Sequence, residues 1–251
     1  DEIYEGDHSG QDLAYVSVNG LKLNPNIEQV IYTGDALPLA YWMDALVAGS
    51  YWDRPGSAQT VTYGFYSSNP LDIPFQAFSA ADQESTRVAF ATWAEHTQLN
   101  FQLVPVEQAD IRLGFFQIDA GGDANYPNSG YSNIRISMGA ASNGALQTGG
   151  WNHVLLHEIG HALGLQHPGD YNGSGPGTAP FLPAAEDTTA FSHLSYHWGS
   201  GVNDFALSMG SRALQRLQAE GDVSATTRMA IFATAVAKNP NEDVARKGRL
   251  M

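Results

Sequence analysis

One short segment constrains this chain more than any other, because it places three histidines around a glycine. It runs from His157 to His167 and reads His-Glu-Ile-Gly-His-Ala-Leu-Gly-Leu-Gln-His. On an α-helix, His157 and His161 project from the same face, so both rings can reach one ion. Gly164 has no Cβ and can adopt a left-handed conformation that ends the helix. The segment therefore predicts a helix and a sharp turn that returns His167 to the same ion.

This spacing predicts a zinc site with one open coordination position. Histidine nitrogens bind zinc at about 2.0–2.1 Å, and three protein ligands leave a fourth position for water. Zinc held in this way lowers the pKa of its water to roughly 7 and polarises a carbonyl group. Glu158 follows the first ligand directly, where a general base for that water is expected. The pattern is typical of a catalytic zinc site rather than a closed structural one.

The complete pattern is far rarer by chance than its first half. His-Glu-x-x-His specifies three positions and would occur by accident in roughly a few of every hundred chains of this length, whereas the added glycine and third histidine lower that rate by about another 1/400. The alternative is a core helix with incidental histidines. The apolar positions Ile159, Ala162, Leu163 and Leu165 would pack such a helix on the core in either case.

Composition excludes several classes of protein. The 251 residues are 43% hydrophobic, enough for one folded domain with terminal extensions. The formal charge of -14 repels phosphate backbones and anionic lipids, so we expect no nucleic acid and no membrane as partner. Cysteine is absent, which excludes disulfides and thiolate ligands. The chain starts at Asp1 without a signal peptide, so we expect a processed or excised form. Nothing in the sequence demands more than a monomer, and the partners expected from the zinc motif are protein or peptide substrates.

Apolar periodicity and turn residues predict helices mixed with strands. We expect a helix over residues 39–47 and a second one after Ser79, which forms a capping box with Asp82. Strands are expected over residues 61–66, 100–106, 110–116 and 132–138. The last of these could be an edge strand that pairs with an extended peptide, or an ordinary strand of the sheet. The order predicts a twisted sheet covered by helices, an α/β or α+β architecture.

Several further stretches resemble the metzincin metallopeptidases, and within them the bacterial secreted serralysin family. Residues 167–172 read His-Pro-Gly-Asp-Tyr-Asn, residues 185–188 read Ala-Glu-Asp-Thr, and residues 191–196 read Phe-Ser-His-Leu-Ser-Tyr. The resemblance spans roughly residues 39 to 217. It implies an α+β fold with a twisted five-stranded mixed sheet, long helices and an active-site cleft. It also implies a catalytic domain at 36–220, between an N-terminal arm at 1–35 and a tail at 221–251.

The resemblance also implies roles for residues beyond the zinc ligands. Tyr196 would be a distal fifth ligand and a hydrogen-bond donor to the tetrahedral intermediate; the alternative is a buried aromatic with a satisfied hydroxyl. Asp187 would brace the turn below the zinc by hydrogen bonding. His153 would lie at the surface or behind the ligands. His193 and His197 could line the cleft or tune the zinc site, and exposed loop histidines are the alternative that we prefer.

Three departures from the family matter. Leu194 replaces the methionine of the turn, an exchange that costs under about 1.5 kcal/mol in a core. Gly210 stands where the family has aspartate, before a partial match at residues 213–217. The glycine-rich calcium-binding repeats are absent, so Ca²⁺ binding cannot be carried over. Residues 221–251 contain an apolar helical stretch at 229–236 and have no assigned role.

These observations predict a secreted zinc-dependent metalloendopeptidase that hydrolyses internal peptide bonds through a zinc-activated water. Glu158 would take the proton of the water and pass it to the leaving amine. The alternative is a catalytically silent zinc-binding module for protein interaction, although structural zinc does not need Glu158. A third possibility is an enzyme specialised for a single partner protein.

Overall fold

Four parallel strands form the centre of the main sheet in the computed structural model. They are rich in β-branched and aromatic residues, as strands buried under helices require. The strands β5, β3, β6 and β8 lie side by side in that order, and β7 pairs antiparallel with β8 at one edge. The short β4 pairs antiparallel with β6. Their bounds are β3 Gln59–Phe65, β4 Phe75–Gln76, β5 Leu99–Leu103, β6 Ile111–Phe116, β7 Gly122–Ala124 and β8 Ser132–Ser137.

The structure describes most of the chain up to residue 198. The described residues are 13–17, 23, 27, 29–34, 38–52, 59–97, 99–127, 130–141, 146, 149–172 and 176–198. The predicted helix at 229–236, the partial match at 213–217 and the whole tail at 221–251 lie outside them. Within the described ranges, no helix combines the length and the apolar character that a bilayer crossing needs.

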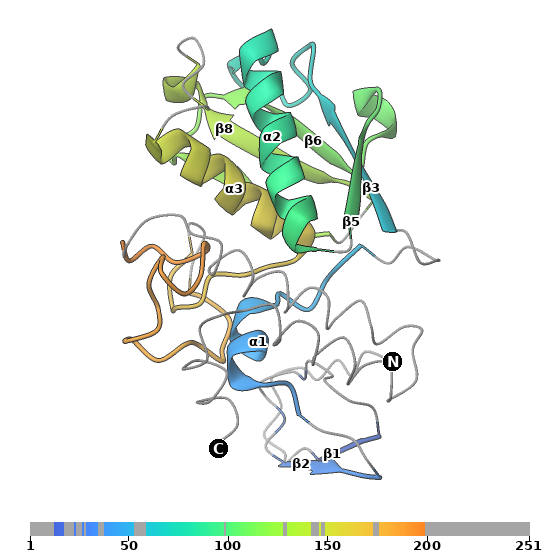
Figure 1. The fold of residues 1–251 in the computed structure, drawn as a ribbon, viewed down its shortest axis with the longest axis vertical. Coiled ribbons are helices and arrows are strands. Elements are labelled where there is room, and N and C mark those ends of the chain that lie inside the picture. The colour runs from blue at the N-terminus through green and yellow to red at the C-terminus, as the bar shows by residue number, and fades with distance from the viewer. Residues whose placement is uncertain are drawn as a thin grey trace.

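Two long helices cover one face of the sheet (Figure 1). Helix α2 (Ala80–His96) begins at Ser79, whose side chain accepts from the Asp82 backbone while Asp82 accepts from the Ser79 backbone, so the predicted capping box is present. Helix α3 (Gly149–Leu163) packs beside it, and the Trp93 indole donates to the Leu156 carbonyl at 3.2 Å. The core between these helices and the sheet fixes the height of α3 above the strands.

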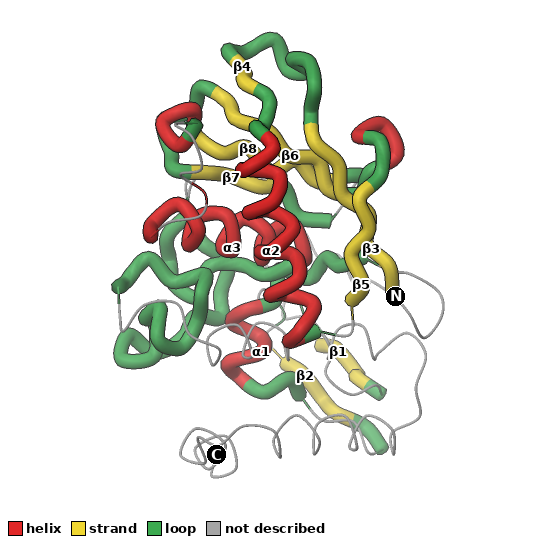
Figure 2. The backbone as a smooth tube through the Cα atoms, turned by 45° about the horizontal axis from the view of Figure 1, so that its top comes forward, coloured by secondary structure: helices red, strands yellow, loops and turns green. Residues whose placement is uncertain are grey.

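A smaller group of elements lies beyond the carboxyl end of α3 (Figures 1 and 2). Helix α1 (Tyr41–Leu46) is followed by residues 47 and 48, whose backbone is paired with residues 164 and 165 after α3. Strands β1 (Leu13–Val16) and β2 (Gln29–Tyr32) form a separate parallel pair. The described residues also include the 3₁₀ turns Val106–Gln108 and Met138–Ala140.

The architecture confirms the predicted α+β class. Five strands form one hydrogen-bonded row, as expected, and β4 makes the sheet six-stranded. The suggestion that residues 132–138 form an edge strand is wrong, because β8 is paired on both sides. The edge strand beside β8 is β7, which the sequence does not reveal because Gly-Asp-Ala is depleted in β-formers.

Candidate metal centre

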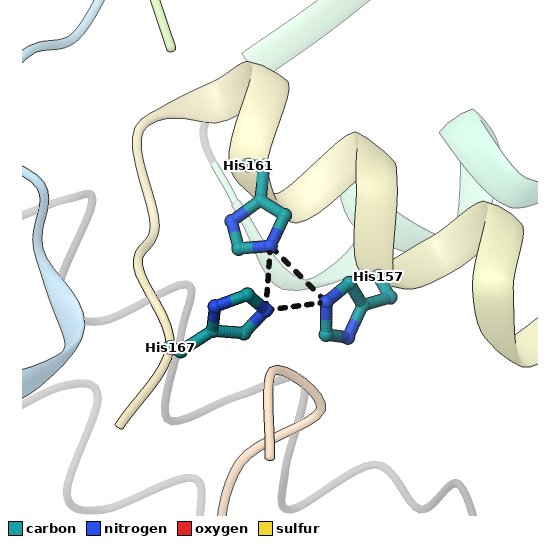
Figure 3. A group of neighbouring side chains, drawn as sticks. All are labelled: His157, His161 and His167. Atoms are coloured by element: carbon teal, nitrogen blue, oxygen red, sulfur yellow. Dashed lines mark hydrogen bonds between the residues drawn. The ribbon is translucent and has the colours of Figure 1, made fainter. Parts of the chain in front are cut away.

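Helix α3 and the turn that follows it bring the three predicted ligands together. Gly164 has a φ of 107°, and its amide donates to the His161 carbonyl at 2.9 Å. After the turn, the Gln166 amide donates to the Leu46 carbonyl at 2.8 Å, which ties the segment to α1. This return carries His167 back to the face of α3 that bears His157 and His161 (Figure 3).

The Nε2 atoms of the three histidines form a nearly equilateral triangle (Figure 3). The separation is 3.0 Å between His157 and His167, and His161 lies 3.1 Å from each of them. An ideal tetrahedral zinc site with 2.0–2.1 Å bonds has ligand separations of about 3.3–3.4 Å. The observed triangle is slightly tighter and fits the three-ligand side of such a site. All three side chains are buried.

The outer nitrogens of these rings show which tautomer each ring adopts. His157 Nδ1 lies 3.1 Å from the His193 carbonyl, and His161 Nδ1 lies 2.7 Å from the Leu165 carbonyl. Because a carbonyl oxygen only accepts, these Nδ1 atoms carry the protons. The His167 ring is hydrogen-bonded to the backbone of Tyr171. The Nε2 lone pairs of His157 and His161 therefore both point inward and repel each other. Neither nitrogen carries a proton, so no hydrogen bond can form between them, whereas a bound cation would remove the repulsion.

Burial keeps the ligands neutral. It lowers the pKa of His161 to about 4. Burial also lowers the pKa of His167 to about 3, and the nearby His161 adds to this shift. Burial also lowers the pKa of His157 well below its ordinary value, and the other two ligands add to this effect. Since a metal binds the neutral imidazole, protons do not compete for these ligands at neutral pH.

Glu158 directly follows the ligand His157 on α3, and one of its carboxyl oxygens is left without a partner in the described part of the chain. Its side chain is buried, and Oε2 has no hydrogen-bond partner among the described residues. Burial raises the pKa of Glu158 to about 8, and the charge of Asp123 adds to this shift. A divalent cation at the triangle would favour the ionised carboxylate. A buried acceptor without a partner beside three convergent nitrogens fits a site completed by a metal ion and its water.

Tyr196 lies over the ligands and is half-exposed. Its ring centroid is 4.5 Å from that of His167 and 5.7 Å from that of His157, and it stacks on Tyr171 at 4.7 Å. Burial, with the charge of Glu158, raises the pKa of the Tyr196 phenol. The hydroxyl thus stays protonated at neutral pH, as a hydrogen-bond donor must.

Asp187 holds the segment that carries Tyr196. It is buried and accepts hydrogen bonds from the Tyr171 hydroxyl at 2.5 Å and from Ser195 Oγ at 2.7 Å. The Tyr196 amide in turn donates to the Tyr171 hydroxyl at 3.3 Å. These contacts connect the loop after His167 with the turn before Tyr196.

Leu194 lies under the ligand-bearing helix. It is 1% exposed, and its Cδ2 would lie 3.1 Å from a Cβ placed on Gly160. Trp93 approaches the same glycine from α2, at 3.3 Å. The glycine between the two ligands therefore lets Leu194 pack directly against the helix backbone, the place that the resemblance assigns to methionine.

The other histidines divide between core and surface. His193 is fully buried, so the preferred prediction of an exposed loop residue is wrong for it; its ring lies against that of His153 at 4.2 Å. His153 is also buried, behind the ligands rather than among them. The His197 side chain is 63% exposed, as expected, with Nδ1 3.1 Å from Asp187 Oδ2.

Sequence reasoning missed Tyr126 at this site. Its ring centroid lies 5.8 Å from that of His161, edge to face. Burial raises the pKa of its phenol to about 12, and Tyr196 and Glu158 add to the shift. A tyrosine two residues beyond an unpredicted three-residue strand carries no signal that would have identified it.

Comparison with known proteins agrees with this geometry. Residues 71–179 match a family described as dual-action HEIGH metallo-peptidase. The chain is 30% identical over 173 residues to a serralysin of Photorhabdus laumondii, covering 60% of this chain and 36% of the relative. It is 32% identical to serralysin G of Dickeya chrysanthemi over 58% of this chain and 34% of the relative. Metalloprotease AprA of Pseudomonas entomophila is 28% identical over 72% of this chain and 41% of its own length.

Two solved structures are also similar to the chain. Myroilysin aligns with a TM-score of 0.40 at 16% identity, over 76% of this chain and 98% of its own. High choriolytic enzyme 1, a hatching enzyme zinc-protease from Oryzias latipes, aligns with a TM-score of 0.33 at 16% identity, over 47% and 50%.

The chain spans about a third of the length of the serralysins it matches. The matched region includes the helix with the His-Glu-Ile-Gly-His motif, the turn and the third histidine. The chain is thus similar to the serralysins, and its residues 71–179 match a metallopeptidase family on an α+β fold.

Proposed function

We propose that this chain is a zinc-dependent endopeptidase that cleaves internal peptide bonds of protein substrates. One observation carries the proposal: three inward-pointing histidine nitrogens lie beside a buried glutamate with an unpartnered oxygen. A structural zinc site has no use for that glutamate, whereas hydrolysis requires a base next to the water. The similarity to serralysins supports the same reaction class.

Each residue would have a distinct part in the reaction. His157, His161 and His167 would hold zinc, which supplies a Lewis acid for the carbonyl and makes water a nucleophile at neutral pH. Glu158 would accept the proton of the attacking water and return it to the leaving amine. Tyr196, protonated and beside the ligands, would donate a hydrogen bond to the oxyanion. Asp187 and Tyr171 would keep the Tyr196 segment in place.

Zinc content measured together with protein hydrolysis tests the proposal. The purified chain should bind one zinc per molecule and cleave unfolded casein, and a chelator should abolish cleavage until zinc is restored. Glu158→Gln should keep the zinc and lose about 10²–10⁴-fold in kcat, the usual contribution of a general base. Glu84→Gln, on the exposed side of α2, is the matched control and should retain full activity.

The same experiment separates the proposed peptidase from a silent zinc-binding module. One zinc per chain without cleavage of any peptide in a broad substrate library would favour the module. We also propose, from the resemblance to serralysins, that the enzyme acts outside the cell. Peptidase activity found in the culture medium and absent from washed, lysed cells would support that location, and the reverse distribution would contradict it.

A further inference from the structure

The edge strand β7 lies directly against the part of α3 that carries Glu158. In the pairing of β7 with β8, Gly122 stands opposite Ile136, and Ala124 stands opposite Ile134. Both isoleucines are fully buried under the helices. Because directly opposite residues point to the same face of a sheet, Gly122 and Ala124 also face the helices. The missing side chain of Gly122 would therefore point at α3.

The space for that side chain is already filled by the proposed base. A Cβ placed on Gly122 would lie 2.8 Å from Glu158 Cγ and 2.9 Å from Oε1, and 2.9 Å from Val154 Cγ1. Two carbon atoms in contact prefer about 3.5–4.0 Å, so a methyl group here forces something to move. Val154 and Glu158 are one helical turn apart, so the backbone of β7 rests on both of them. Gly122 allows a close approach that no other residue permits.

Nothing else described in the structure fixes the carboxylate from the side of Oε2. That oxygen is buried and has no hydrogen-bond partner among the described residues. Asp123, the next residue of β7, does not help, since its carboxylate forms a two-bond pair with Arg135 at 2.6 and 2.7 Å. On the side of Oε2 the Glu158 carboxylate is thus placed by packing, and the backbone of Gly122 is part of that packing.

We propose that Gly122 is a positioning residue for Glu158: the bare backbone of β7 forms a wall that sets where the carboxylate stands relative to the three histidines. The catalytic consequence rests on the proposed function, but the placement itself does not. Displacing a reacting group by about 1 Å can cost about a hundredfold in rate. Gly122→Ala should therefore lower kcat by about that factor, with KM changed less than about twofold and zinc content unchanged, because the three atoms nearest to the new methyl group belong to Glu158 and Val154 and not to a zinc ligand.

The test compares three variants with the wild type. Gly121→Ala is the matched control, because its Cβ would meet only Val154 and Trp151 at 3.4 Å or more, an ordinary contact. Gly122→Ala with Val154→Ala removes the clash with valine and leaves the clash with Glu158. Each protein is assayed for zinc content and for kcat and KM, and crystal structures of the metal-free proteins locate the Glu158 carboxylate. The metal-free structures keep the outcome independent of any activity.

The expected result is a displaced Glu158 side chain in Gly122→Ala, with reduced kcat that Val154→Ala does not restore and that Gly121→Ala does not reproduce. A structure in which Glu158 keeps its place and β7 moves instead would overturn the proposal, as would full recovery in the double variant. If Gly122→Ala fails to fold, the position of Glu158 and the kcat of the double variant decide between the two outcomes. An inactive wild type would defeat the proposed function, yet the position of Glu158 in the variant structures would still decide this inference.

Discussion

Three histidine side chains, spaced along one helix and the turn after it, form the metal-binding part of this site. His157, His161 and His167 were predicted as one ligand set, and their Nε2 atoms lie within 3.0–3.1 Å of one another. The spacing could not reveal which groups receive the outer ring protons. Those acceptors, the carbonyls of His193 and Leu165, depend on how later segments fold against α3.

Removal of the Tyr196 hydroxyl should separate catalysis from binding. Tyr196→Phe keeps the ring that stacks on Tyr171 and loses only the donor. We expect kcat to fall by about 10²–10³-fold, the usual effect of removing one oxyanion donor, with little change in KM. Steady-state kinetics on a fluorogenic peptide measures both. Tyr131→Phe, at an exposed ring under Arg112, is the control. An unchanged kcat in Tyr196→Phe would restrict Tyr196 to packing.

At the scale of elements, the turn after α3 joins the metal site to the part of the fold around α1. Val47 and Leu165 form an isolated antiparallel bridge, and the Ala48 amide donates to the Gly164 carbonyl at 2.9 Å. A Cβ on Gly164 would lie 2.2 Å from the Ser50 carbonyl oxygen. The third ligand is therefore held by backbone pairing that leaves no room for a side chain at the turn.

Gly164→Ala should weaken zinc binding. The methyl group meets the Ser50 carbonyl, so the chain after the turn must shift and carry His167 away from the other ligands. We expect at least a tenfold loss in zinc affinity, measured by competition with a chelator, in addition to lower stability. Gly130→Ala isolates the backbone strain, because Gly130 has a φ of 97° and open space around it. Equal zinc affinity in the two variants would show that the contact with Ser50 does not matter.

The elements also show what sequence reasoning can reach. Helix α2 was predicted from Ser79 and Asp82 because capping is a local interaction. Strands β3 and β6 were predicted from the residues of their own segments, and β8 from the alternation of apolar and polar residues along it. Strand β7 was missed because it forms only through its pairing with β8. The contact between Gly122 and Glu158 is likewise non-local, so no sequence window contains it.

For the whole molecule, five buried histidines make the metal-free fold sensitive to acid. Burial lowers the pKa of every one of them below 6.5: His153, His157, His161, His167 and His193. Between about pH 4 and 6.5 the unfolded chain binds protons that the fold excludes, so stability falls as pH falls. The effect of Glu158 on the pH dependence of stability has the opposite sign. Its pKa is raised to about 8, so the folded protein keeps a proton that the unfolded chain releases above pH 4.5, and stability falls as pH rises.

The metal-free protein should therefore be most stable near pH 7. Below this pH the protonation of five histidines in the unfolded chain outweighs the effect of the single glutamate, and between about pH 7 and 8 the cost of ionising Glu158 is the larger effect, so stability declines again. Urea denaturation at intervals from pH 4.5 to 8.5, in the presence of a chelator, measures this profile. Glu158→Gln should remove the alkaline decline and leave the acid side intact. Stability that keeps rising to pH 8 in the unaltered chain would contradict the assignment.

The main-chain acceptors behind the ligands also bear on how this site tolerates mutation. The Nδ1–H groups of His157 and His161 donate hydrogen bonds to backbone carbonyl oxygens. Since every residue has a backbone carbonyl, no single amino-acid substitution can remove these acceptors. Substitutions at 165 or 193 alter the attached side chain and leave the oxygen in place, provided that the local backbone path survives. The tautomers of these two ligands thus depend on the path of the backbone and not on particular side chains. The side chains around them can therefore change in sequence without changing the tautomers.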